Sequence, residues 1–354
     1  MQQVYAVIMA GGVGTRFWPL STPQRPKQLL PLAHREIPLL REAALRLLPM
    51  VDWEHILVAT SESLRTAVQE LLPELPQHNL LCENIGRNTA PCIAWAAMHV
   101  AKSDPDALLL VTPADHTISN DQAFQHALNQ GLQVAQQGTL VTLGIPPTRA
   151  HTGYGYIEVG KSINAEVYQV NRFVEKPNQS TAETLLAQGN YWWNSGMFVF
   201  HTQAILSALQ THLPQWHQAL APIMQTPSVD AETAWIAKVY PDLDPISIDY
   251  GVLEKVDDMA VVRSSFSWSD LGSWENAWEL AAKDAQGNVS RGHVCAIDSQ
   301  GCYLRADASK PIALLGVKDL IVVDTPRALL IVPRERSQEI RQLVSQVSSE
   351  ENKL

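Results

Sequence analysis

The sequence has little of what structural metal modules and hydrolase triads require. It contains four cysteines, which form no Cys-x-x-Cys pair and stand at no zinc spacing from a histidine: Cys82, Cys92, Cys295 and Cys302. The 11 histidines show no His-Glu-x-x-His pattern, and nothing resembles a nucleophilic triad. These absences argue against a structural metal site. They favour reduced thiols, so we expect a cytoplasmic protein.

The chain also lacks an excess of positive charge and any long hydrophobic run. Its 26 Lys and Arg residues stand against 36 Asp and Glu, which gives a formal net charge of -10. Nucleic-acid polymers and anionic membranes need clustered cations, so neither is expected as a partner. No apolar stretch is long enough to span a bilayer, and the N-terminus has no basic lead of the kind that begins a signal peptide.

What the sequence does have is a glycine-rich turn near its N-terminus. A β-prone run at residues 4–9 leads into three glycines within residues 11–14, and Arg16 and Lys27 follow. Glycine permits positive φ and leaves backbone N–H groups uncovered, so anionic oxygens can approach the main chain. Phe17 stands where a dinucleotide fingerprint needs its third glycine, and the Walker A pattern is not met either. The turn therefore predicts a different kind of polyphosphate site.

Short apolar runs alternate with helical patterns along the first part of the chain. The apolar runs lie at residues 4–9, 55–60, 107–112 and 138–144, and the helical patterns at 38–48, 61–72, 89–101 and 120–136. This alternation predicts an α/β fold with a mostly parallel central sheet flanked by helices. Ligands in such sheets bind beyond the carboxyl ends of the strands, where the glycine turn falls.

The C-terminal part has a different pattern. Short apolar strands recur at residues 293–297, 303–305, 312–315, 320–323 and 328–332, and a polar helix is expected from 335 to about 347. We place the boundary in the turn-rich stretch 284–288, which gives a large α/β domain at 1–285 and a small C-terminal β domain, short and solenoid-like, at 286–354. Exposed β edges are usually covered, so these strands favour a homodimer.

Residues 10–21, Ala-Gly-Gly-Val-Gly-Thr-Arg-Phe-Trp-Pro-Leu-Ser, and Pro-Lys-Gln at 26–28 carry a family signature. They resemble the sugar-1-phosphate nucleotidylyltransferases, most closely the mannose-1-phosphate guanylyltransferase branch. The resemblance implies a Rossmann-like nucleotidyltransferase domain that binds the triphosphate through Ala10, Gly11, Gly12, Gly14, Thr15 and Arg16. It covers nearly the whole chain. Some relatives continue into an isomerase domain beyond the point where this chain stops, so we expect a short form with one activity.

The reaction implied by the resemblance transfers GMP from GTP to α-D-mannose 1-phosphate and gives GDP-mannose and pyrophosphate. A sugar phosphate is already a good oxygen nucleophile, so Mg²⁺-assisted in-line displacement needs alignment and charge neutralisation only. The implied catalytic residues are Arg16, Lys27, Asp115, Lys176 and Asp270. Two alternatives stay open: transfer to another hexose or heptose 1-phosphate, and a catalytically silent nucleotide-sugar-binding regulatory subunit.

Two aspartates far apart in sequence are candidate metal ligands. Asp115 ends a hydrophobic run at 108–116, and Asp270 precedes Leu-Gly-Ser-Trp. Taken alone, the first could be a turn aspartate and the second a helix cap. The resemblance favours metal binding for both, and Mg²⁺ typically takes one or two carboxylates plus phosphate oxygens.

The segment Glu-Asn-Ile-Gly-Arg-Asn-Thr-Ala-Pro at residues 83–91 has the features of a helix start, with Asn88 or Thr89 as N-cap and Pro91 in the first turn. It also resembles the base-recognition segment of the guanylyltransferase branch. The resemblance implies that Glu83, Arg87, Asn88 and Thr89 bind the guanine nucleotide.

The sugar-phosphate site is implied by Phe-Val-Glu-Lys-Pro at residues 173–177. In the family this element holds the sugar hydroxyls through the glutamate, here Glu175, and the sugar phosphate through the lysine, here Lys176. The resemblance assigns the rest of the hexose pocket to Gly153, Tyr154, Gly155, Asn194 and Asp249. From the residues alone, Tyr154 is more readily a packing aromatic than a ligand, and Asp249 more readily a positioning residue or a cap than a reactant.

Overall fold

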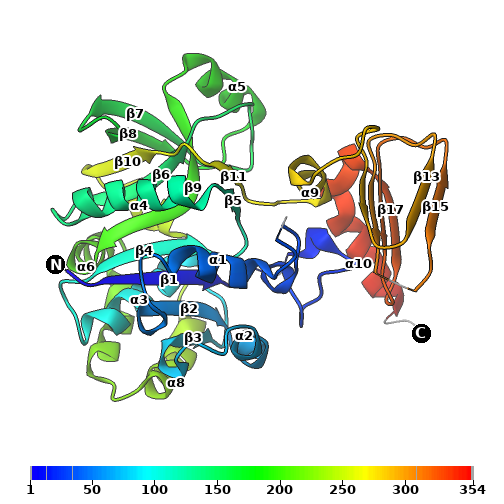
Figure 1. Ribbon diagram of the computed structural model, residues 1–354. Coiled ribbons are helices and arrows are strands. Elements are labelled where there is room, and N and C mark those ends of the chain that lie inside the picture. The colour runs from blue at the N-terminus through cyan, green and yellow to red at the C-terminus, as the bar shows by residue number, and fades with distance from the viewer. Residues whose placement is uncertain (1, 13, 34, 308, 352–354) are drawn as a thin grey trace. The chain divides into compact units, whose positions relative to one another are not determined.

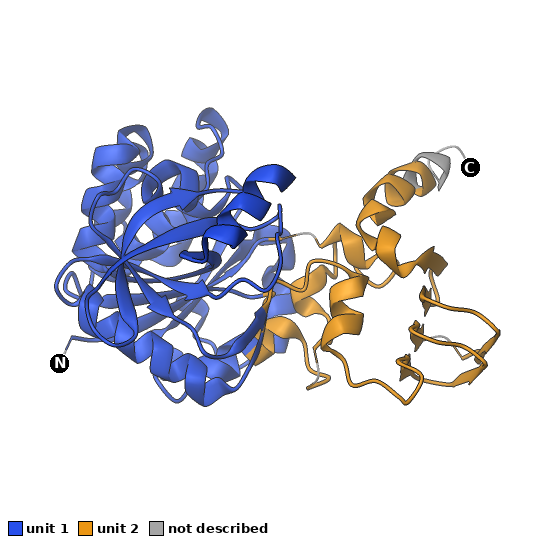
Figure 2. Cartoon of the chain, turned by 90° about the horizontal axis from the view of Figure 1, so that it is seen from above, with its two compact units in different colours: residues 1–11, 43–114, 118–268 blue, residues 12–42, 115–117, 269–354 orange. Residues whose placement is uncertain are grey.

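The computed structural model describes residues 2–12, 14–33, 35–307 and 309–351 of the chain. They divide into two compact units, shown in Figure 2. Unit 1 holds residues 1–11, 43–114 and 118–268, and unit 2 holds residues 12–42, 115–117 and 269–354. Because the units interleave along the chain, the domain boundary near residue 285 stays a prediction.

Unit 1 is built on a nine-stranded sheet of order β3-β2-β1-β4-β9-β6-β10-β8-β7. The strands are β1 (Val4–Ala10), β2 (Ile56–Ser61), β3 (Leu80–Glu83), β4 (Leu108–Pro113), β6 (Leu140–Ile145), β7 (Tyr156–Ser162), β8 (Val167–Val174), β9 (Tyr191–His201) and β10 (Met259–Arg263). The first four in the order pair in parallel, as do β6 and β10, whereas β9 runs antiparallel to β4, β6 and β7.

The α/β class is confirmed, and so are the strands expected at residues 4–9, 55–60, 107–112 and 138–144, within two residues at each end. The sheet is mixed rather than mostly parallel, because β7 and β8 are joined by the short turn at residues 163–166 and pair antiparallel. A connection that short cannot carry the chain back across a sheet for parallel pairing. Strand β3 was not predicted, since it is only four residues long.

Helices cover both faces of this sheet (Figure 1). They are α1 (Leu39–Leu47), α2 (Arg65–Leu71), α3 (Thr89–Ala101), α4 (Asp121–Ala135), α5 (Gln179–Gln188), α6 (Thr202–His212), α7 (Pro214–Leu220) and α8 (Val229–Val239). Short 3-10 helices are η3 (Trp53–His55), η4 (Glu62–Leu64), η5 (Gln77–Asn79), η6 (Ala221–Gln225) and η7 (Tyr240–Asp242), and η8 (Asp249–Leu253) is a π-helix. None of the described helices combines the length and hydrophobicity that a membrane span needs.

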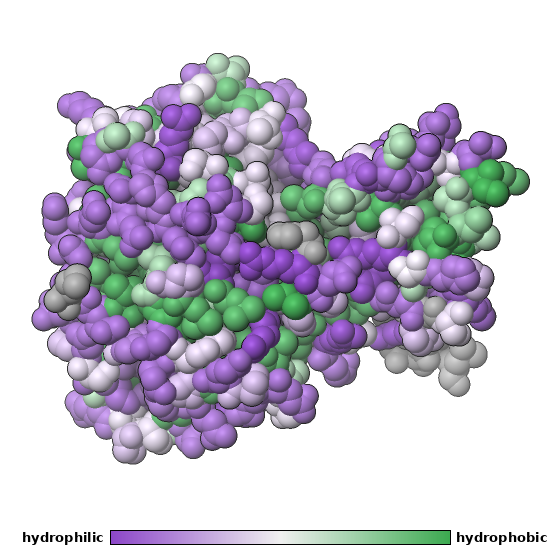
Figure 3. Space-filling view, in the orientation of Figure 1, coloured by the Kyte–Doolittle hydropathy of each residue, from purple (hydrophilic) through white to green (hydrophobic). Residues whose placement is uncertain are grey.

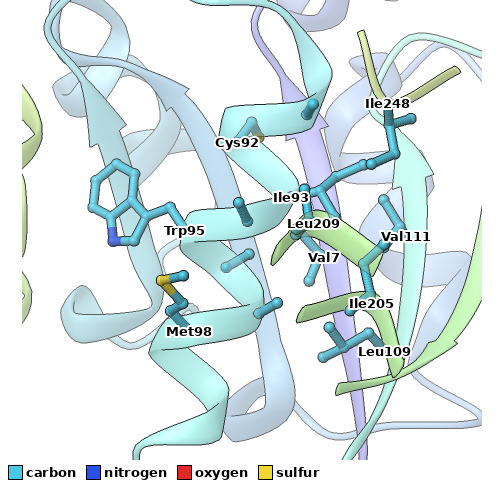
Figure 4. Packing of buried hydrophobic residues seen from close by; sticks show 14 of the residues in the cluster. Val7, Cys92, Ile93, Trp95, Met98, Leu109, Val111, Ile205, Leu209 and Ile248 are labelled. Atoms are coloured by element: carbon cyan, nitrogen blue, oxygen red, sulfur yellow. The ribbon is translucent and has the colours of Figure 1, made fainter. Parts of the chain in front are cut away.

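Alternating residues of the strands face opposite helices. Val7 and Val111 lie in one cluster with Ile93 of α3 and Ile205 of α6 (Figure 4). On the other face α4 packs so closely that a Cβ at Gly131 would lie 2.9 Å from a methyl group of Val199. The backbone of α4 can approach the sheet this closely only because residue 131 has no side chain.

A buried carboxylate joins α3 to α8. Glu232 is fully buried, and its carboxylate accepts a hydrogen bond from Trp95 Nε1 at 2.8 Å and lies 2.9 Å from His99 Nδ1 and 2.5 Å from Lys102 Nζ. The three partners stand four and three residues apart, so they share one face of the helix. Burial by itself would raise the pKa of Glu232, but His99, Lys102 and Trp95 together lower the pKa below its usual value.

The unit 2 strands form stacked turns. The described strands are β12 (Val289–Arg291), β14 (Tyr303–Ala306) and β16 (Leu320–Asp324), paired in parallel, β17 (Leu329–Pro333), antiparallel to β16, and the parallel pair β13 (Val294–Ile297) and β15 (Ile312–Leu315). They are followed by η9 (Arg334–Glu339) and α10 (Ile340–Glu351). The small C-terminal β domain is confirmed.

Two further short strands, β5 (Thr117–Ser119) and β11 (Ser267–Ser269), pair with each other.

The segment that carries the glycine turn packs into the core of unit 2. It contains η1 (Thr15–Phe17) and η2 (Lys27–Leu29). Phe17 makes an edge-to-face contact with Trp274, the first residue of α9 (Trp274–Leu280), with ring centroids 5.0 Å apart. Trp274 Nε1 donates to the carbonyl of Trp18 at 3.1 Å, and the Trp274 ring also contacts Tyr303 of β14. The turn is therefore supported by the same aromatic core as the β domain.

The buried Glu232 network gives a stability prediction. We expect Glu232→Gln to lower the free energy of unfolding at pH 7 by about 2 kcal/mol, because Lys102 and His99 lose their charged partner. A carboxyl whose folded pKa is lowered stabilises above its unfolded pKa and loses that contribution as the pH falls through the folded pKa. Urea unfolding at pH 7 and at pH 4 measures both effects. The control is Glu183→Gln on exposed α5. Equal stability of the two variants at pH 7 would contradict the prediction.

Candidate functional site

A pocket of about 250 Å³ lies within unit 2, around the glycine turn. We refer to it as the glycine-loop pocket. Its walls are Gly12, Gly14, Arg16, Phe17, Lys27, Asp115, His116, Asp270, Leu271, Gly272 and Arg341. Four segments far apart in sequence therefore supply cations and carboxylates to one cavity.

Gly14 and Gly12 are suited to their positions for different structural reasons. Gly14 has φ 63°, and a Cβ there would lie 2.3 Å from Lys27 Cβ, so only glycine fits. The Ser21 hydroxyl fixes this turn by donating to the Gly14 carbonyl at 2.8 Å. At Gly12, and at Gly11 before it, a Cβ would meet nothing within 4 Å, so the main chain borders open space. Backbone amides beside open space suit the close approach of phosphate oxygens.

Lys27 is the central charge of the pocket. It is only 5% exposed, and its ammonium lies 2.8 Å from Asp115 Oδ2 and 2.5 Å from the carbonyl oxygen of Asp270. Burial by itself would raise the pKa of Asp115, but the neighbouring Lys27 and, after it, His116 lower the pKa below its usual value. Asp115 is consequently held as a carboxylate.

The second carboxylate belongs to the same pocket. A Cβ at Gly272 would lie 3.0 Å from Asp270 Oδ2 and 3.4 Å from Arg16 Nη1, so both side chains approach the bare side of Gly272. Arg16 is also held by η9, since its Nη1 donates to Gln338 Oε1 of that helix at 2.8 Å. The structure thus places Arg16, Lys27, Asp115 and Asp270 around one cavity, as the sequence predicts.

The donor set of this pocket fits a hard divalent cation. Asp115 and Asp270 are both partly exposed and offer carboxylate oxygens. The described part of the chain has no group of three His, Cys, Asp or Glu side chains that could hold a metal ion by itself. Mg²⁺ commonly binds through one or two carboxylates and takes the rest of its shell from water and substrate phosphates. Two carboxylates beside the glycine turn match that chemistry.

A second group of candidate residues lies in unit 1, at the end of β3. Glu83 is buried, and its Oε1 has no hydrogen-bond partner among the described residues. Burial raises the pKa of Glu83 to about 7, against a smaller opposite effect of the Tyr240 hydroxyl. A buried acceptor without a partner is costly unless a ligand supplies a donor.

The other residues of this segment bind the chain that follows α8. Arg87 Nε and Nη2 donate to the carbonyls of Tyr240 and Pro241 at 2.7 and 2.8 Å. Thr89 Oγ1 accepts from the Ile248 amide at 2.9 Å. Asn88 caps α3, with φ 72° and its Oδ1 accepting from the Thr89 amide at 2.9 Å. The predicted helix start is confirmed, and the nucleotide contacts of Arg87, Asn88 and Thr89 stay predictions.

The third group, also in unit 1, contains the residues predicted for the sugar phosphate. Lys176 and Glu175 form an ion pair, and the Asn194 amide of β9 donates to Asp249 Oδ1 at 2.9 Å. Burial, and after it the Glu175 charge, raise the pKa of Asp249 to about 6. A Cβ at Gly155 would lie 2.4 Å from Glu175 Oε2, so the glycine leaves room for that carboxylate. These five residues therefore lie together.

Tyr154 has a packing role. It is buried, and its ring stacks on His151 with centroids 3.9 Å apart and meets Trp193 edge to face at 5.1 Å. Gly153 lies beside it, and its amide donates to His151 Nδ1 at 3.1 Å. The structure thus gives Tyr154 the aromatic contacts that the alternative interpretation of this residue expects.

Sequence reasoning missed several residues of these sites. Gly272 lies inside the Asp-Leu-Gly-Ser-Trp motif, whose glycine was a usable signal. Arg341 lines the glycine-loop pocket from α10, and Tyr240 lies near Glu83. Neither stands in a recognisable motif, because each reaches its site only through the packing of elements distant in sequence.

Comparison with known proteins decides the family. The model of the nucleotidyl transferase family matches residues 5–287. The chain belongs to this family. A second model, described as the MannoseP isomerase/GMP-like beta-helix domain, matches residues 292–347. Members of the family generally use a divalent metal, which the two carboxylates of the glycine-loop pocket fit.

Named relatives are similar over nearly the whole chain. A mannose-1-phosphate guanylyltransferase of Klebsiella pneumoniae is 40% identical, with 96% of this chain and 72% of the relative covered. The xanthan biosynthesis protein XanB of Xanthomonas campestris is also 40% identical, with 99% and 74% covered. A crystal structure described as mannose-1-phosphate geranyltransferase from Thermus thermophilus matches with TM-score 0.88 and 35% identity, covering 98% of this chain and all of that one. The family resemblance seen in the motifs is confirmed.

The environment of Glu83 predicts a pH-dependent stability. A carboxyl whose folded pKa is raised favours the folded state below its unfolded pKa, and this contribution is lost as the pH rises through the folded pKa. From pH 5 to pH 8 we expect the wild type to lose roughly 2 to 3 kcal/mol of stability relative to Glu83→Gln, because the pKa is about 7. Urea unfolding at both pH values measures the difference.

The matched control is Glu70→Gln, which removes an exposed carboxyl of α2. Its stability relative to the wild type should stay constant over the same pH range. If the curves for Glu83→Gln and the wild type run parallel from pH 5 to pH 8, the proposed burial of the Glu83 charge is wrong.

Proposed function

We propose that this protein transfers GMP from GTP to α-D-mannose 1-phosphate and releases GDP-mannose and pyrophosphate. The observation that carries the proposal is the glycine-loop pocket, where Arg16, Lys27 and Arg341 share one cavity with Asp115 and Asp270. Three cations and two carboxylates at a bare backbone turn suit a metal-bound triphosphate. The names of the relatives supply the substrate class.

The nucleotide half of the proposal assigns the triphosphate to the turn. Its oxygens accept hydrogen bonds from the backbone amides of residues 10–12, 14 and 15, and Arg16 adds a planar, charged donor. The guanine ring carries N–H donors on its N1 and N2 edge. Glu83, with its unsatisfied buried oxygen, is suited to accept them, and Arg87, Asn88 and Thr89 frame this segment.

The sugar half assigns mannose 1-phosphate to the third group. Lys176 binds the phosphate, and Glu175 and Asn194 bind sugar hydroxyls, with Asp249 holding the Asn194 amide. Gly153, Tyr154 and Gly155 form the apolar and backbone wall. A carboxylate and an amide can read the positions of several hydroxyl groups, which is the recognition a hexose requires.

The chemistry is an in-line displacement. A phosphate oxygen of mannose 1-phosphate forms a bond to the α-phosphorus of GTP, and the bond from that phosphorus to the oxygen bridging to the β-phosphorus breaks, so that pyrophosphate leaves with the electron pair. Asp115 and Asp270 would hold Mg²⁺, which supplies neutralisation of the charge that develops on the phosphates. Lys27 and Arg16 stabilise the same charge from fixed positions, and Lys176 aligns the nucleophile. No proton transfer by the protein is needed.

The test is pyrophosphate release on mixing the protein with Mg²⁺, GTP and mannose 1-phosphate. We expect turnover by the wild type, and a loss of at least about a thousandfold in kcat for Asp115→Asn with the fold intact by circular dichroism. Asp257→Asn, which removes an exposed carboxylate, is the matched control. Near-normal turnover of Asp115→Asn would refute the metal assignment. Turnover only with other NTPs or sugar phosphates would refute the substrate assignment.

Four free cysteines, three of them buried, accompany this proposal. Unoxidised thiols are typical of reducing compartments. We place the reaction in the cytoplasm.

We also propose that the protein is a homodimer that associates through unit 2. Leu315 is 72% exposed and pairs in register with Ile297 at 55%. On β17, an edge strand, Ile331 is 59% and Leu329 is 55% exposed. Hydrophobic surface lies on the β13 and β15 side of unit 2 in Figure 3. Exposed apolar edge strands normally need a cover, and a second copy supplies one.

The dimer proposal is tested by sedimentation equilibrium. We expect a dimer for the wild type and a weakening of at least about tenfold for Ile331→Lys, because a buried ammonium has no partner in an apolar interface. Ile163→Lys, on an exposed turn of unit 1, is the control and should remain dimeric. A monomeric wild type, or equal association of the two variants, would contradict the proposal.

A further inference from the structure

The base-recognition segment and the chain that leads into the sugar-phosphate group are joined by several hydrogen bonds inside unit 1. Besides the two Arg87 bonds to carbonyls 240 and 241, the Ile246 amide donates to the Arg87 carbonyl and the Ala90 amide donates to the Ile246 carbonyl, both at 3.1 Å. The Ile248 amide donates to Thr89 Oγ1 at 2.9 Å. The start of α3 therefore holds residues 240–248 in place through these hydrogen bonds.

The last of these bonds lies next to a predicted sugar ligand. Ile248 immediately precedes Asp249, the first residue of the π-helix η8. Asp249 Oδ1 accepts from Asn194 Nδ2, and Asn194 Oδ1 in turn accepts from the Thr142 hydroxyl at 3.0 Å. A continuous chain of contacts thus joins Thr89 to Asn194. It runs through the backbone of Ile248 and the side chain of Asp249.

Packing leaves this path little freedom. Ile248 is fully buried and belongs to the same hydrophobic cluster as Ile93 of α3 (Figure 4). The apolar contact anchors the Ile248 side chain, and the Thr89 hydroxyl fixes its backbone. Loss of that hydroxyl would leave a backbone N–H group without its partner, which favours a shift of the peptide that carries Asp249. Such π-helical segments recur at functional sites.

We infer that Thr89 is a positioning residue for the sugar-phosphate side of the reaction, acting through Ile248 and Asp249. This inference rests on the proposed function. This role differs from the direct nucleotide contact predicted for Thr89, because it uses the hydroxyl oxygen to accept the Ile248 amide. It also gives the base segment a physical connection to the sugar ligands. Displacement of reacting groups by less than about 1 Å is enough to change substrate use severalfold.

The test compares Thr89→Val with Thr89→Ser in initial-rate measurements over a matrix of GTP and mannose 1-phosphate concentrations. We expect Thr89→Val to raise KM for mannose 1-phosphate roughly five- to tenfold while KM for GTP changes less than about twofold. Thr89→Ser keeps the hydroxyl and should restore the wild-type KM. Thr211→Val, which removes an exposed helix hydroxyl of α6, is the matched control and should change neither KM.

A double-mutant cycle with Asp249→Asn provides a second measurement. If Thr89 acts through Asp249, the effects of Thr89→Val and Asp249→Asn on KM for mannose 1-phosphate should be strongly non-additive. Full additivity would overturn the inference. An increase of KM for GTP that equals or exceeds the increase for the sugar phosphate would do so as well, as would failure of Thr89→Ser to restore activity.

The outcome also separates this inference from the proposed function. A wild type that releases no pyrophosphate from GTP and mannose 1-phosphate overturns both. An active wild type together with a Thr89→Val variant whose KM values are unchanged overturns the positioning role alone.

Discussion

The Lys27 ammonium buried between Asp115 and the Asp270 carbonyl is the interaction on which the glycine-loop pocket depends. A lysine that is almost fully buried is stable only when its charge and its N–H donors are satisfied. The partners come from the end of a strand and from a turn after residue 268, so the charge holds three distant segments of unit 2 in one arrangement. The cost of leaving any one of them unpaired defines the geometry of the cavity.

The same arrangement suits the negative charge of the proposed substrates. Substrates with several phosphates bring more negative charge than one cation can offset, and the pocket distributes its positive charge over a point charge and planar guanidinium groups. Because two oxygens hold Lys27 in place, little reorganisation of this lysine would be required for a phosphate to bind beside it. Preorganised charge of this kind is the main way in which proteins accelerate phosphoryl and nucleotidyl transfer.

Much of the fold follows from local pattern, whereas the site depends on motifs. The parallel strands β1, β2 and β4 were predicted because short apolar runs between helices leave few other folds. The antiparallel strands after residue 155 were not placed, because turn length, and not hydrophobicity, decides their direction. The motif residues Arg16, Lys27, Asp115 and Asp270 meet as expected. Arg341 and the Thr89 contact with Ile248 could not be predicted, since they arise where helix ends meet loops far along the chain.

Phe17, Trp274 and Tyr303 form one continuous aromatic contact beneath the glycine turn. Aromatic side chains bury large areas, so such a contact contributes strongly to the local stability of both partners. The glycine turn and the β domain therefore depend on each other for stability. A chain in which the region after residue 268 was exchanged would need a matching Trp274 and Tyr303 to keep Phe17, a wall of the glycine-loop pocket, packed in place. In this protein the C-terminal strands therefore support one wall of the glycine-loop pocket.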